Sequence, residues 1–369
     1  MHRLIHNFLP LIIATLSALA ESTIELRYAE NFEITEFPTH RILTIRNTHP
    51  NTESKTQYAL VSKDTPLPDL PDGITVIRTP VERVVVMETV YIGYLDAIQA
   101  LDTIVGAGTV DFVSNSEVQA RIQSKQIQSV QVGQGLDIER MLLLQPDLIL
   151  TSISGDPALD VPAKLTRSGL PVVYTAGYME AHPLARAEWI QYIAAFFEAD
   201  ELAAAQFQQV ADDYEAFKAI AATAVNQPTV LAGAPYSGTW HVAAGQSYTA
   251  QAIRDAGGDY LWSDVDRPGA IALDTERVFL KAATADIWLN PSFYRSSAEL
   301  FAADQRFKKF KAANEGNVFN NTKQVGPKGG NAIWEQGIVH PDKVLADMIK
   351  IFHPNRLPDH EFVFYERLQ

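Results

Sequence analysis

The segment from Asp200 to Val225 constrains the fold more than any other part of this sequence. It contains no Gly or Pro and is rich in Ala, Glu and Gln, which favour a helix. Its apolar residues recur at spacings of three and four and so form one helical stripe: Ala203, Phe207, Val210, Tyr214, Phe217, Ala221 and Ala224. A helix of this length spans about 39 Å, the width of a domain. It is either a rigid connection between two lobes or an ordinary long surface helix.

One sequence pattern occurs on both sides of this segment. Leu136–Leu143 and Leu273–Leu280 both read L-D-x-E-R-x-x-L. Each copy is followed by an apolar run typical of a strand, at Asp147–Leu150 and at Asp286–Leu289. We therefore expect two lobes built on the same plan, one before the long helix and one after it.

The order of the remaining elements predicts an α/β fold. From Arg83 onward, short strand-like runs alternate with helical segments, a pattern typical of mainly parallel sheets flanked by helices. Residues 23–63 instead read as consecutive strands, the first of which contains Ile24, Leu26 and Tyr28. We thus expect two lobes with mainly parallel sheets, joined by one long helix, plus a β-rich N-terminal extension. The expected boundaries are a signal peptide at 1–20, the extension at 21–80, the first lobe at 81–199, the linking helix at 200–226, the second lobe at 227–352 and a surface tail at 353–369.

The N-terminus reads as an export signal. Arg3 precedes the apolar run Phe8–Leu19, and Ala18–Ala20 has the small-residue pattern of a cleavage site. The run is short for a membrane span, so an uncleaved anchor is the less favoured alternative. The sequence contains no cysteine. We therefore expect a protein that is free in a periplasm and carries no lipid on an N-terminal cysteine.

Charge and motif content argue against several functions. The formal net charge of −14, with no run of basic residues, argues against nucleic acid as a partner. The motifs G-x-S-x-G, H-E-x-x-H and G-x-x-x-x-G-K are absent. His2 and His6 lie in the expected signal peptide, and no pair among the other seven histidines has the spacing of a helical metal site. We accordingly expect no catalytic residue, metal site or cofactor, and a protein that is not an enzyme.

The repeated pattern places a carboxylate at the start of a helix in each lobe. Asp137 and Asp274 are positioned to cap the two helices, and Glu139 and Glu276 fall in the first turns. Acidic side chains there favour the positive end of a helix by ~0.3–1 kcal/mol, which is sufficient reason for either glutamate alone. The alternative is that the two glutamates are matched docking points for a partner that carries arginines.

These residues resemble the substrate-binding proteins of ABC importers for iron complexes and cobalamin, in which a rigid helix joins two lobes. The resemblance extends from about Val81 to His353. It rests on the following segments: Gly133, Leu136–Arg140, Leu144–Ile149, Gly169–Val173, Asp255–Gly258, Leu273–Glu276 and His340–Met348. Two features depart from the family pattern: the strand-rich residues 23–80 exceed the usual N-terminus, and the lipid-bearing cysteine common in the family is missing.

The resemblance implies a set of partners. In that family a glutamate on each lobe docks onto arginines of the membrane permease, a role that falls here on Glu139 and Glu276. The implied ligand is a small-molecule metal chelate or corrinoid, held in the cleft between the lobes. The implied protein partner is an ABC permease in the inner membrane, and the chain itself is expected to be a monomer.

Candidate ligand-binding residues follow the expected strands, because ligands of parallel α/β sheets bind at the carboxyl ends of the strands. The candidates are Glu88, Thr89, Tyr178, Arg186, Tyr236, Trp240, Arg267, Tyr294, Arg295 and Trp334. Their rings suit a flat apolar ligand and their guanidinium groups suit an anionic chelate. Core packing is the alternative for each aromatic residue and is favoured for Trp189 and Tyr248. A solvated surface position is the alternative for each arginine.

The main hypothesis is therefore a periplasmic carrier for an iron–siderophore-type complex. Cobalamin or haem as the ligand is the first alternative. A periplasmic hydrolase that uses carboxylates such as Glu88 and Glu188 is a less favoured alternative. A third alternative is a sensor or adhesion module that presents the strand-rich N-terminus.

Overall fold

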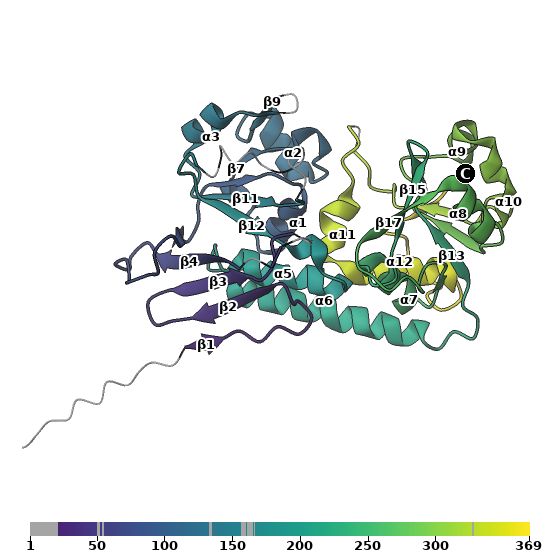
Figure 1. The fold of residues 1–369 in the computed structure, drawn as a ribbon, viewed down its shortest axis with the longest axis horizontal. Coiled ribbons are helices and arrows are strands. Elements are labelled where there is room, and N and C mark those ends of the chain that lie inside the picture. The colour runs from purple at the N-terminus through teal and green to yellow at the C-terminus, as the bar shows by residue number, and fades with distance from the viewer. Residues whose placement is uncertain are drawn as a thin grey trace, which may run out of the picture.

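The computed structural model describes residues 21–49, 52–53, 55–132, 135–155, 160, 165, 167–326 and 328–369. Figure 1 shows two lobes that lie side by side, with helix α6 beneath both of them. The expected signal peptide at 1–20 and Gly133 lie outside the described residues. Within the described residues, no helix combines the length and the apolar composition needed to cross a membrane.

The N-terminal extension forms a five-stranded sheet in the order β1-β2-β3-β4-β5, antiparallel except for the β4–β5 pair. Its strands are β1 (Ser22–Thr23), β2 (Phe32–Glu36), β3 (Arg41–Ile45), β4 (Thr56–Ser62) and β5 (Thr75–Thr79). One face is apolar and packs on the first lobe, where the ring of Phe32 lies 4.7 Å from that of Trp189. The expected strand through Ile24, Leu26 and Tyr28 is wrong, because residues 24–31 run outside the sheet.

The first lobe is built on a parallel sheet in the order β12-β11-β6-β7-β8. Its strands are β6 (Val84–Val86), β7 (Ile104–Ala107), β8 (Gln128–Ser129), β11 (Leu148–Ser152) and β12 (Val172–Thr175), with a separate pair β9 (Gln131–Val132) and β10 (Gly135–Leu136). Its helices are α1 (Val90–Ala97), η1 (Leu101–Thr103), η2 (Val110–Phe112), α2 (Ser116–Gln123), α3 (Ile138–Leu144), η3 (Gly177–Met179) and α5 (Pro183–Ala194). Val84–Val86 is wholly buried, as expected of a strand covered on both faces.

The second lobe repeats this plan with a sheet in the order β16-β13-β18-β19-β20, parallel except for the β19–β20 pair. Its strands are β13 (Thr229–Ala232), β16 (Asp259–Tyr260), β18 (Ile287–Leu289), β19 (Val318–Asn320) and β20 (Glu366–Arg367), with a small antiparallel sheet of β14 (Pro235–Tyr236), β15 (Thr239–Ala243) and β17 (Ala270–Asp274). Its helices are α7 (Tyr248–Asp255), α8 (Thr275–Ala282), α9 (Ser297–Ala303), η4 (Gln305–Lys309), α10 (Lys311–Asn314), η5 (Ala332–Trp334), α11 (Gln336–Val339) and α12 (Pro341–Phe352). The expected α/β fold with mainly parallel sheets in two lobes is confirmed.

Helix α6 (Asp200–Ala221) has 22 residues and spans ~33 Å. It ends at Ala221 rather than at the expected residue 226. Residues 222 and 223 form a turn, and the chain is then irregular up to Pro228. Phe207, Val210 and Tyr214 are buried, as the predicted stripe requires. The helix packs against α5 of the first lobe and against α12 of the second, so it connects the two lobes.

Two buried carboxylates hold the irregular residues 27–31 of the extension on the first lobe. The carboxylate of Glu188 accepts hydrogen bonds from the backbone N–H groups of residues 27, 28 and 29 at 2.7–2.8 Å. The carboxylate of Glu180 accepts from the N–H groups of residues 30 and 31 and from Trp189 Nε1. These hydrogen bonds therefore hold the extension on the first lobe.

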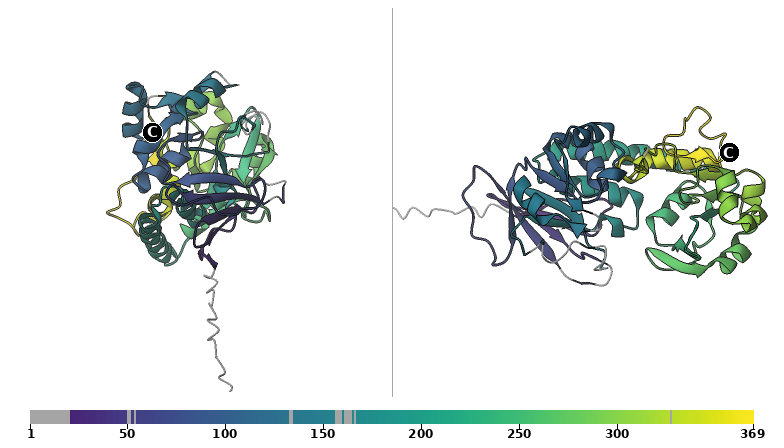
Figure 2. Two further views of the ribbon diagram at one scale, coloured as in Figure 1. Left: turned by 90° about the vertical axis from the view of Figure 1, so that its left-hand side faces the viewer. Right: turned by 90° about the horizontal axis from the view of Figure 1, so that it is seen from above.

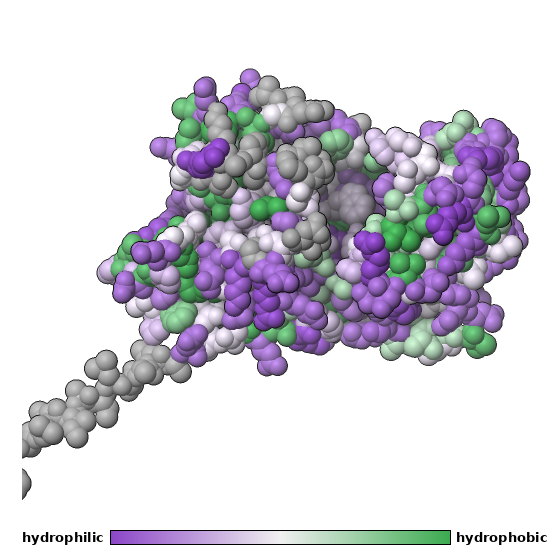
Figure 3. All heavy atoms as spheres, in the orientation of Figure 1, coloured by the Kyte–Doolittle hydropathy of each residue, from purple (hydrophilic) through white to green (hydrophobic). Residues whose placement is uncertain are grey.

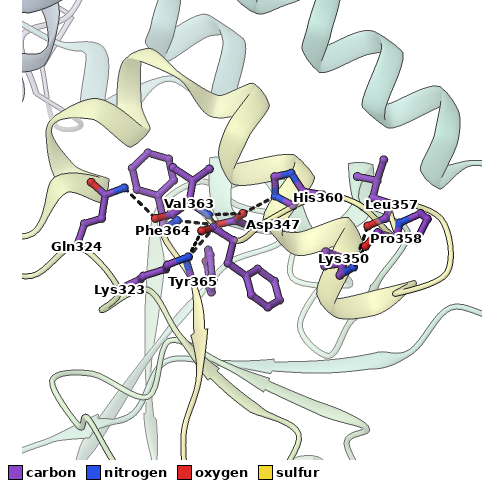
Figure 4. Close-up of polar contacts among 11 residues, drawn as sticks. Lys323, Gln324, Asp347, Lys350, Leu357, Pro358, His360, Val363, Phe364 and Tyr365 are labelled. Carbon is purple, nitrogen blue, oxygen red and sulfur yellow. Dashed lines mark hydrogen bonds and ion pairs between the residues drawn. The ribbon is translucent and has the colours of Figure 1, made fainter.

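The C-terminal tail is held in the same way and does not merely wrap the surface (Figure 4). The carboxylate of Asp347 on α12 accepts hydrogen bonds from the N–H groups of Val363, Phe364 and Tyr365. Residue His360 places Nε2 2.7 Å from Asp347 Oδ1. Phe364 and Tyr365 are buried, so the tail belongs to the core of the second lobe.

A fourth carboxylate, that of Glu335, connects the first lobe to the segment that crosses between the lobes; this segment includes α11 and α12 and appears in yellow in Figure 2. The buried Glu335 accepts from the N–H groups of Ser114 and Asn115 of the first lobe at 2.6 and 3.0 Å. Gly93 on α1 allows this approach, because a Cβ atom there would lie 2.3 Å from the carbonyl oxygen of Glu335. The lobes are thus fixed to each other by this segment as well as by α6.

Replacing Glu188 by Ala should lower the free energy of unfolding by about 3 kcal/mol, because one buried and two partly buried N–H groups lose their acceptor. Urea unfolding followed by circular dichroism measures the change. The control is Glu361→Ala, which alters an exposed carboxylate. Equal stability of the two variants would contradict the assigned role of Glu188.

Candidate functional site

Four adjoining pockets lie between and beside the lobes in the described part of the chain, and Figure 3 shows the hollow between the lobes. The central pocket is lined by Arg186, Tyr248, Asn290, Asn321 and Trp334 together with apolar residues of α11 and α12. It shares Asn290, Asn321 and Trp334 with a larger pocket of ≈ 530 Å³, which we call the Phe112 pocket. It shares Tyr248 with a pocket of ≈ 690 Å³ on the other side, which we call the Arg267 pocket. The pockets therefore adjoin one another through shared lining residues, and we call them together the cleft.

Several polar residues of this cleft lie just after the carboxyl ends of strands. Thr89 follows β6, Asn290 follows β18 and Asn321 follows β19. All three strands are parallel members of their sheets, so their carboxyl ends meet at the edge that faces the other lobe. The cleft thus occupies the place where parallel α/β sheets commonly bind ligands.

Arg186 is the charged residue at the centre of the cleft. Its guanidinium carbon lies 4.1 Å from the ring centroid of Tyr248, so the first lobe and the second lobe are in cation–π contact here. Its Nε and Nη1 atoms are buried and have no hydrogen-bond partner among the described residues. Buried N–H groups usually have an acceptor, so this guanidinium can bind an anionic group that enters the cleft.

Arginines outnumber carboxylates around the cleft. Arg295 lines the Phe112 pocket and Arg267 lines the pocket named after it. Among the described residues that line the four pockets, the only carboxylate is that of Glu180. That carboxylate already accepts hydrogen bonds from Trp189 and from residues 30 and 31. The cleft of this acidic protein is therefore locally cationic.

Glu88 lies behind the wall of the first lobe. Its Oε1 atom accepts hydrogen bonds from Thr151 Oγ1, Ser152 N and Ser152 Oγ, whereas its Oε2 atom is buried without a partner among the described residues. Burial disfavours the charged form and raises the pKa of the Glu88 carboxyl to about 7. Glu88 can therefore exchange a proton near neutral pH.

Six of the predicted ligand-binding residues line the cleft. Thr89, Arg295 and Trp334 meet in the Phe112 pocket, and Trp334 also lies beside Arg186 in the central pocket. Tyr178 and Arg267 meet in the Arg267 pocket. A small side pocket in the first lobe contains both Tyr178 and Arg186. The position of each of these residues is therefore known, and its role in ligand binding stays a prediction.

The other predicted residues do not line the cleft. Trp240 is wholly buried and packs among Trp288 and other rings of the second lobe, so its expected cleft position is wrong: β15 turns its side chain into the core. Tyr236 is 76% exposed on β14, outside the four pockets. Tyr294 is half-buried and packs against the core. Glu88 lies behind the wall rather than on it.

Two further expectations concern Trp189 and Glu188. The favoured core position of Trp189 is confirmed, since only 1% of this residue is exposed. Glu188, proposed for a hydrolase, is wholly buried and its carboxylate binds the backbone of the extension. It is therefore not accessible to a substrate.

Sequence reasoning missed many residues of the cleft, including the following five. Tyr248 was expected in the core, yet it lines two pockets because it opens α7 at the edge of the cleft. Asn290 and Asn321 follow directly after β18 and β19, so the strand-end rule could have found them. Phe112 and Phe293 are 57% and 87% exposed in the Phe112 pocket, and nothing in their sequence surroundings indicated this.

The repeated helices begin as predicted. Asp137 caps α3 by accepting from Arg140 N, and Asp274 caps α8 by accepting from Arg277 N. Glu139 and Glu276 are both exposed near the starts of these helices. Glu276 forms an ion pair with Arg306, with Nη1 3.0 Å from Oε1.

Glu88 should make the stability of the protein depend on pH. Because its folded-state pKa of about 7 exceeds the ordinary value of 4.5, the folded protein binds more protons than the unfolded chain between these pH values, and stability falls as pH rises. Relative to Glu88→Gln, the wild type should lose about 3 kcal/mol of unfolding free energy between pH 4.5 and pH 8. Urea unfolding at a series of pH values measures this, with Glu361→Gln as the control. Parallel pH profiles of wild type and Glu88→Gln would contradict the assignment.

Comparisons with known proteins agree with this architecture. An uncharacterized lipoprotein of Methanocaldococcus jannaschii is 26% identical over 325 residues, which are 84% of this chain and 75% of that protein. A periplasmic heme binding protein of Pseudomonas aeruginosa has a similar fold, with a TM-score of 0.57 and 17% identity over 78% of this chain and 98% of that chain. The molybdate periplasmic binding protein MolA of Haemophilus influenzae also has a TM-score of 0.57, with 15% identity over 78% of this chain and 90% of that chain. The family model described as periplasmic binding protein matches residues 84–325. The chain therefore belongs to the periplasmic binding protein family.

Proposed function

We propose that this protein captures an anionic metal chelate of the iron–siderophore type in the cleft between its lobes and delivers it to an ABC permease in the inner membrane. The observation that carries the proposal is Arg186, which lines a cleft shared by both lobes and whose buried Nε and Nη1 atoms have no partner among the described residues. An unsatisfied guanidinium at such a place favours a ligand with carboxylate, catecholate or similar acceptors.

The rest of the cleft supports a chelate of appreciable size. Arg267 and Arg295 stand in pockets on opposite sides of Arg186, so acidic groups of one ligand can reach more than one arginine. Tyr178, Tyr248 and Trp334 offer ring faces to the apolar parts. Helix α6 and the hydrogen bonds of Glu335 both connect the two lobes. They favour ligand binding with little hinge movement, because both connections would have to deform for one lobe to move relative to the other.

Haem is the second candidate. Phe112 and Phe293 are exposed aromatic residues from the two lobes and line one pocket together with Arg295 and Trp334. Such an arrangement suits a flat macrocycle that carries acidic groups.

We further propose that the mature protein is free in the periplasm as a monomer. The absence of cysteine from the sequence supports the first part of this proposal, because a lipid on an N-terminal cysteine requires that residue.

Tryptophan fluorescence tests the choice of ligand. Trp334 is 49% exposed in the cleft, so a bound iron chelate or haem should quench its emission. We expect saturable quenching by a ferric siderophore within a panel that includes haem and cobalamin. A flat response to every member of the panel would overturn the proposal, and a response to cobalamin alone would replace it.

The Arg186→Gln variant should bind the quenching ligand about 10- to 100-fold more weakly, because a charge-assisted hydrogen bond is lost and no other described group replaces it. The Kd comes from the same titration. Arg46→Gln, on the extension, is the control and should bind as the wild type does. Undiminished affinity of Arg186→Gln would show that the ligand does not use the central guanidinium.

Docking gives a separate prediction. The double variant Glu139→Ala, Glu276→Ala should abolish transport by the reconstituted permease and leave ligand affinity unchanged, because both carboxylates are exposed and lie outside the cleft pockets. Uptake into proteoliposomes and fluorescence titration measure the two quantities. A loss of ligand affinity instead would mean that the carboxylates have a structural role.

A further inference from the structure

Tyr248 and Arg186 come from different lobes and meet in the central pocket of the cleft. Tyr248 is the first residue of α7 in the second lobe, and Arg186 lies on α5 of the first lobe. The guanidinium carbon of Arg186 lies 4.1 Å from the centroid of the Tyr248 ring, which is within the range of a cation–π contact. Both residues line the central pocket, so their contact lies at the site proposed for the ligand.

The contact with the ring leaves hydrogen-bonding capacity of the guanidinium unused. Nε and Nη1 of Arg186 are buried and have no acceptor among the described residues. A guanidinium can stack on an aromatic ring and still donate hydrogen bonds in its own plane, because the two interactions use different directions. Tyr248 can therefore restrain Arg186 without occupying the N–H groups that bind an anion.

Both partners of this contact are placed by interactions of their own. Tyr94 Oη donates a hydrogen bond of 2.6 Å to the carbonyl oxygen of Arg186, which fixes the backbone of α5 at this point. Ser247 caps α7 by accepting from the N–H group of Ala250, so the helix begins at Tyr248. The long side chain of the arginine is then the part of the pair that has the most rotamer freedom to lose.

The helices α5 and α7 are joined a second time near this contact. His182, the residue before α5, places Nε2 3.6 Å from Oδ2 of Asp255 at the end of α7. The same carboxylate oxygen accepts a hydrogen bond of 2.9 Å from Tyr214 Oη on α6. Three helices therefore meet at Asp255, and this junction keeps α7 beside α5. Because the ring of Tyr248 and the guanidinium of Arg186 belong to different lobes, their contact depends on this spacing.

The carboxylates of the cleft and of the helix junction do not compete with a ligand for Arg186. Glu180, which lines the Arg267 pocket, accepts from Trp189 Nε1 and from backbone N–H groups of the extension. Asp255 accepts from side chains of α6 and α7. Neither carboxylate accepts a hydrogen bond from Arg186 Nε or Nη1. In the described part of the chain, an aromatic ring and not a carboxylate therefore restrains this guanidinium.

We propose that Tyr248 is a positioning residue: its ring holds the guanidinium of Arg186 in place across the cleft and so presents the free N–H groups to an anionic group of the ligand. The inference rests on the proposed function and adds to it a residue of the opposite lobe that acts through the arginine. An arginine whose rotamer is set beforehand loses less conformational entropy when the ligand binds. Ordering one such side chain strengthens binding by roughly 2- to 10-fold.

A measurement without ligand tests the restraint itself. Arginine Nε–Hε signals of the full isotope-labelled protein are recorded by NMR, and the signal of Arg186 is identified by its loss in Arg186→Gln. We expect the Tyr248 ring to shift this signal in the wild type, and Tyr248→Phe to keep the shift. Tyr248→Leu should lose it, because leucine has no π face, and leucine is a good helix former, so α7 is retained. An unmoved signal in Tyr248→Leu would overturn the proposal.

The affinity of the full protein for a ferric tricatecholate siderophore, an anionic chelate, tests what the restraint does. Tyr248→Leu should weaken binding up to about 10-fold, and should have no effect when residue 186 is already Gln, because a positioning residue acts only through the arginine. Tyr248→Phe keeps the ring and should bind as the wild type does. The matched control is Phe301→Leu, which removes a cation–π contact with Lys308 outside the four pockets and should not change the affinity.

The remaining outcomes decide against the proposal. A loss of affinity in Tyr248→Leu that persists in the Arg186→Gln background would mean that the ring contacts the siderophore directly. An equal loss in Tyr248→Phe would assign the effect to the hydroxyl group. Failure of the proposed function is a separate result, because the wild type would then bind no member of the ligand panel, whereas the NMR signal of Arg186 would still report the restraint.

Discussion

Buried carboxylates that bind backbone N–H groups hold together segments that are remote in sequence. Glu188 and Glu180 bind the extension, Glu335 binds the first lobe from the crossing segment, and Asp347 binds the tail. Irregular backbone is costly to bury unless its N–H groups find acceptors, and a carboxylate has room for several. Burial raises the pKa values of the Glu180 and Glu335 carboxyls, so these junctions combine strong hydrogen bonds with a cost in desolvation.

The same junctions shape the cleft. Glu180 lines the Arg267 pocket and follows directly after η3, which carries Tyr178. Glu335 is the neighbour of Trp334, and Tyr365, held through Asp347, lines the central pocket. Tyr178, Trp334 and Tyr365 thus lie at or beside contacts to other parts of the chain. A cleft built in this way is formed before the ligand arrives, which reduces the ordering cost of binding.

The sequence predicted the elements well and the cleft only in part. Periodicity found α6, and the repeated pattern found both lobes and their capped helices, because these features depend on local spacing. The strand-end rule placed Thr89, but it also selected Trp240, because it does not tell on which side of a strand a side chain lies. The antiparallel strands β15 and β17 turn Trp240 inward, and their pairing joins residues about 30 positions apart. The residues held by Glu188 were read as a strand for a similar reason: their hydrogen-bond acceptor is 159 or more positions away.

The continuity of the apolar interior has a consequence for cooperativity. One cluster of buried side chains runs from Phe32 in the extension through Tyr214 on α6 to Leu368 near the end of the chain. The two lobes look modular, yet neither one has all of its interior within its own stretch of sequence. Cleaving the chain between the lobes would divide this interior and expose apolar surface on both pieces. The protein should accordingly melt in one main transition, and fragments that correspond to single lobes should fail to fold when they are produced alone.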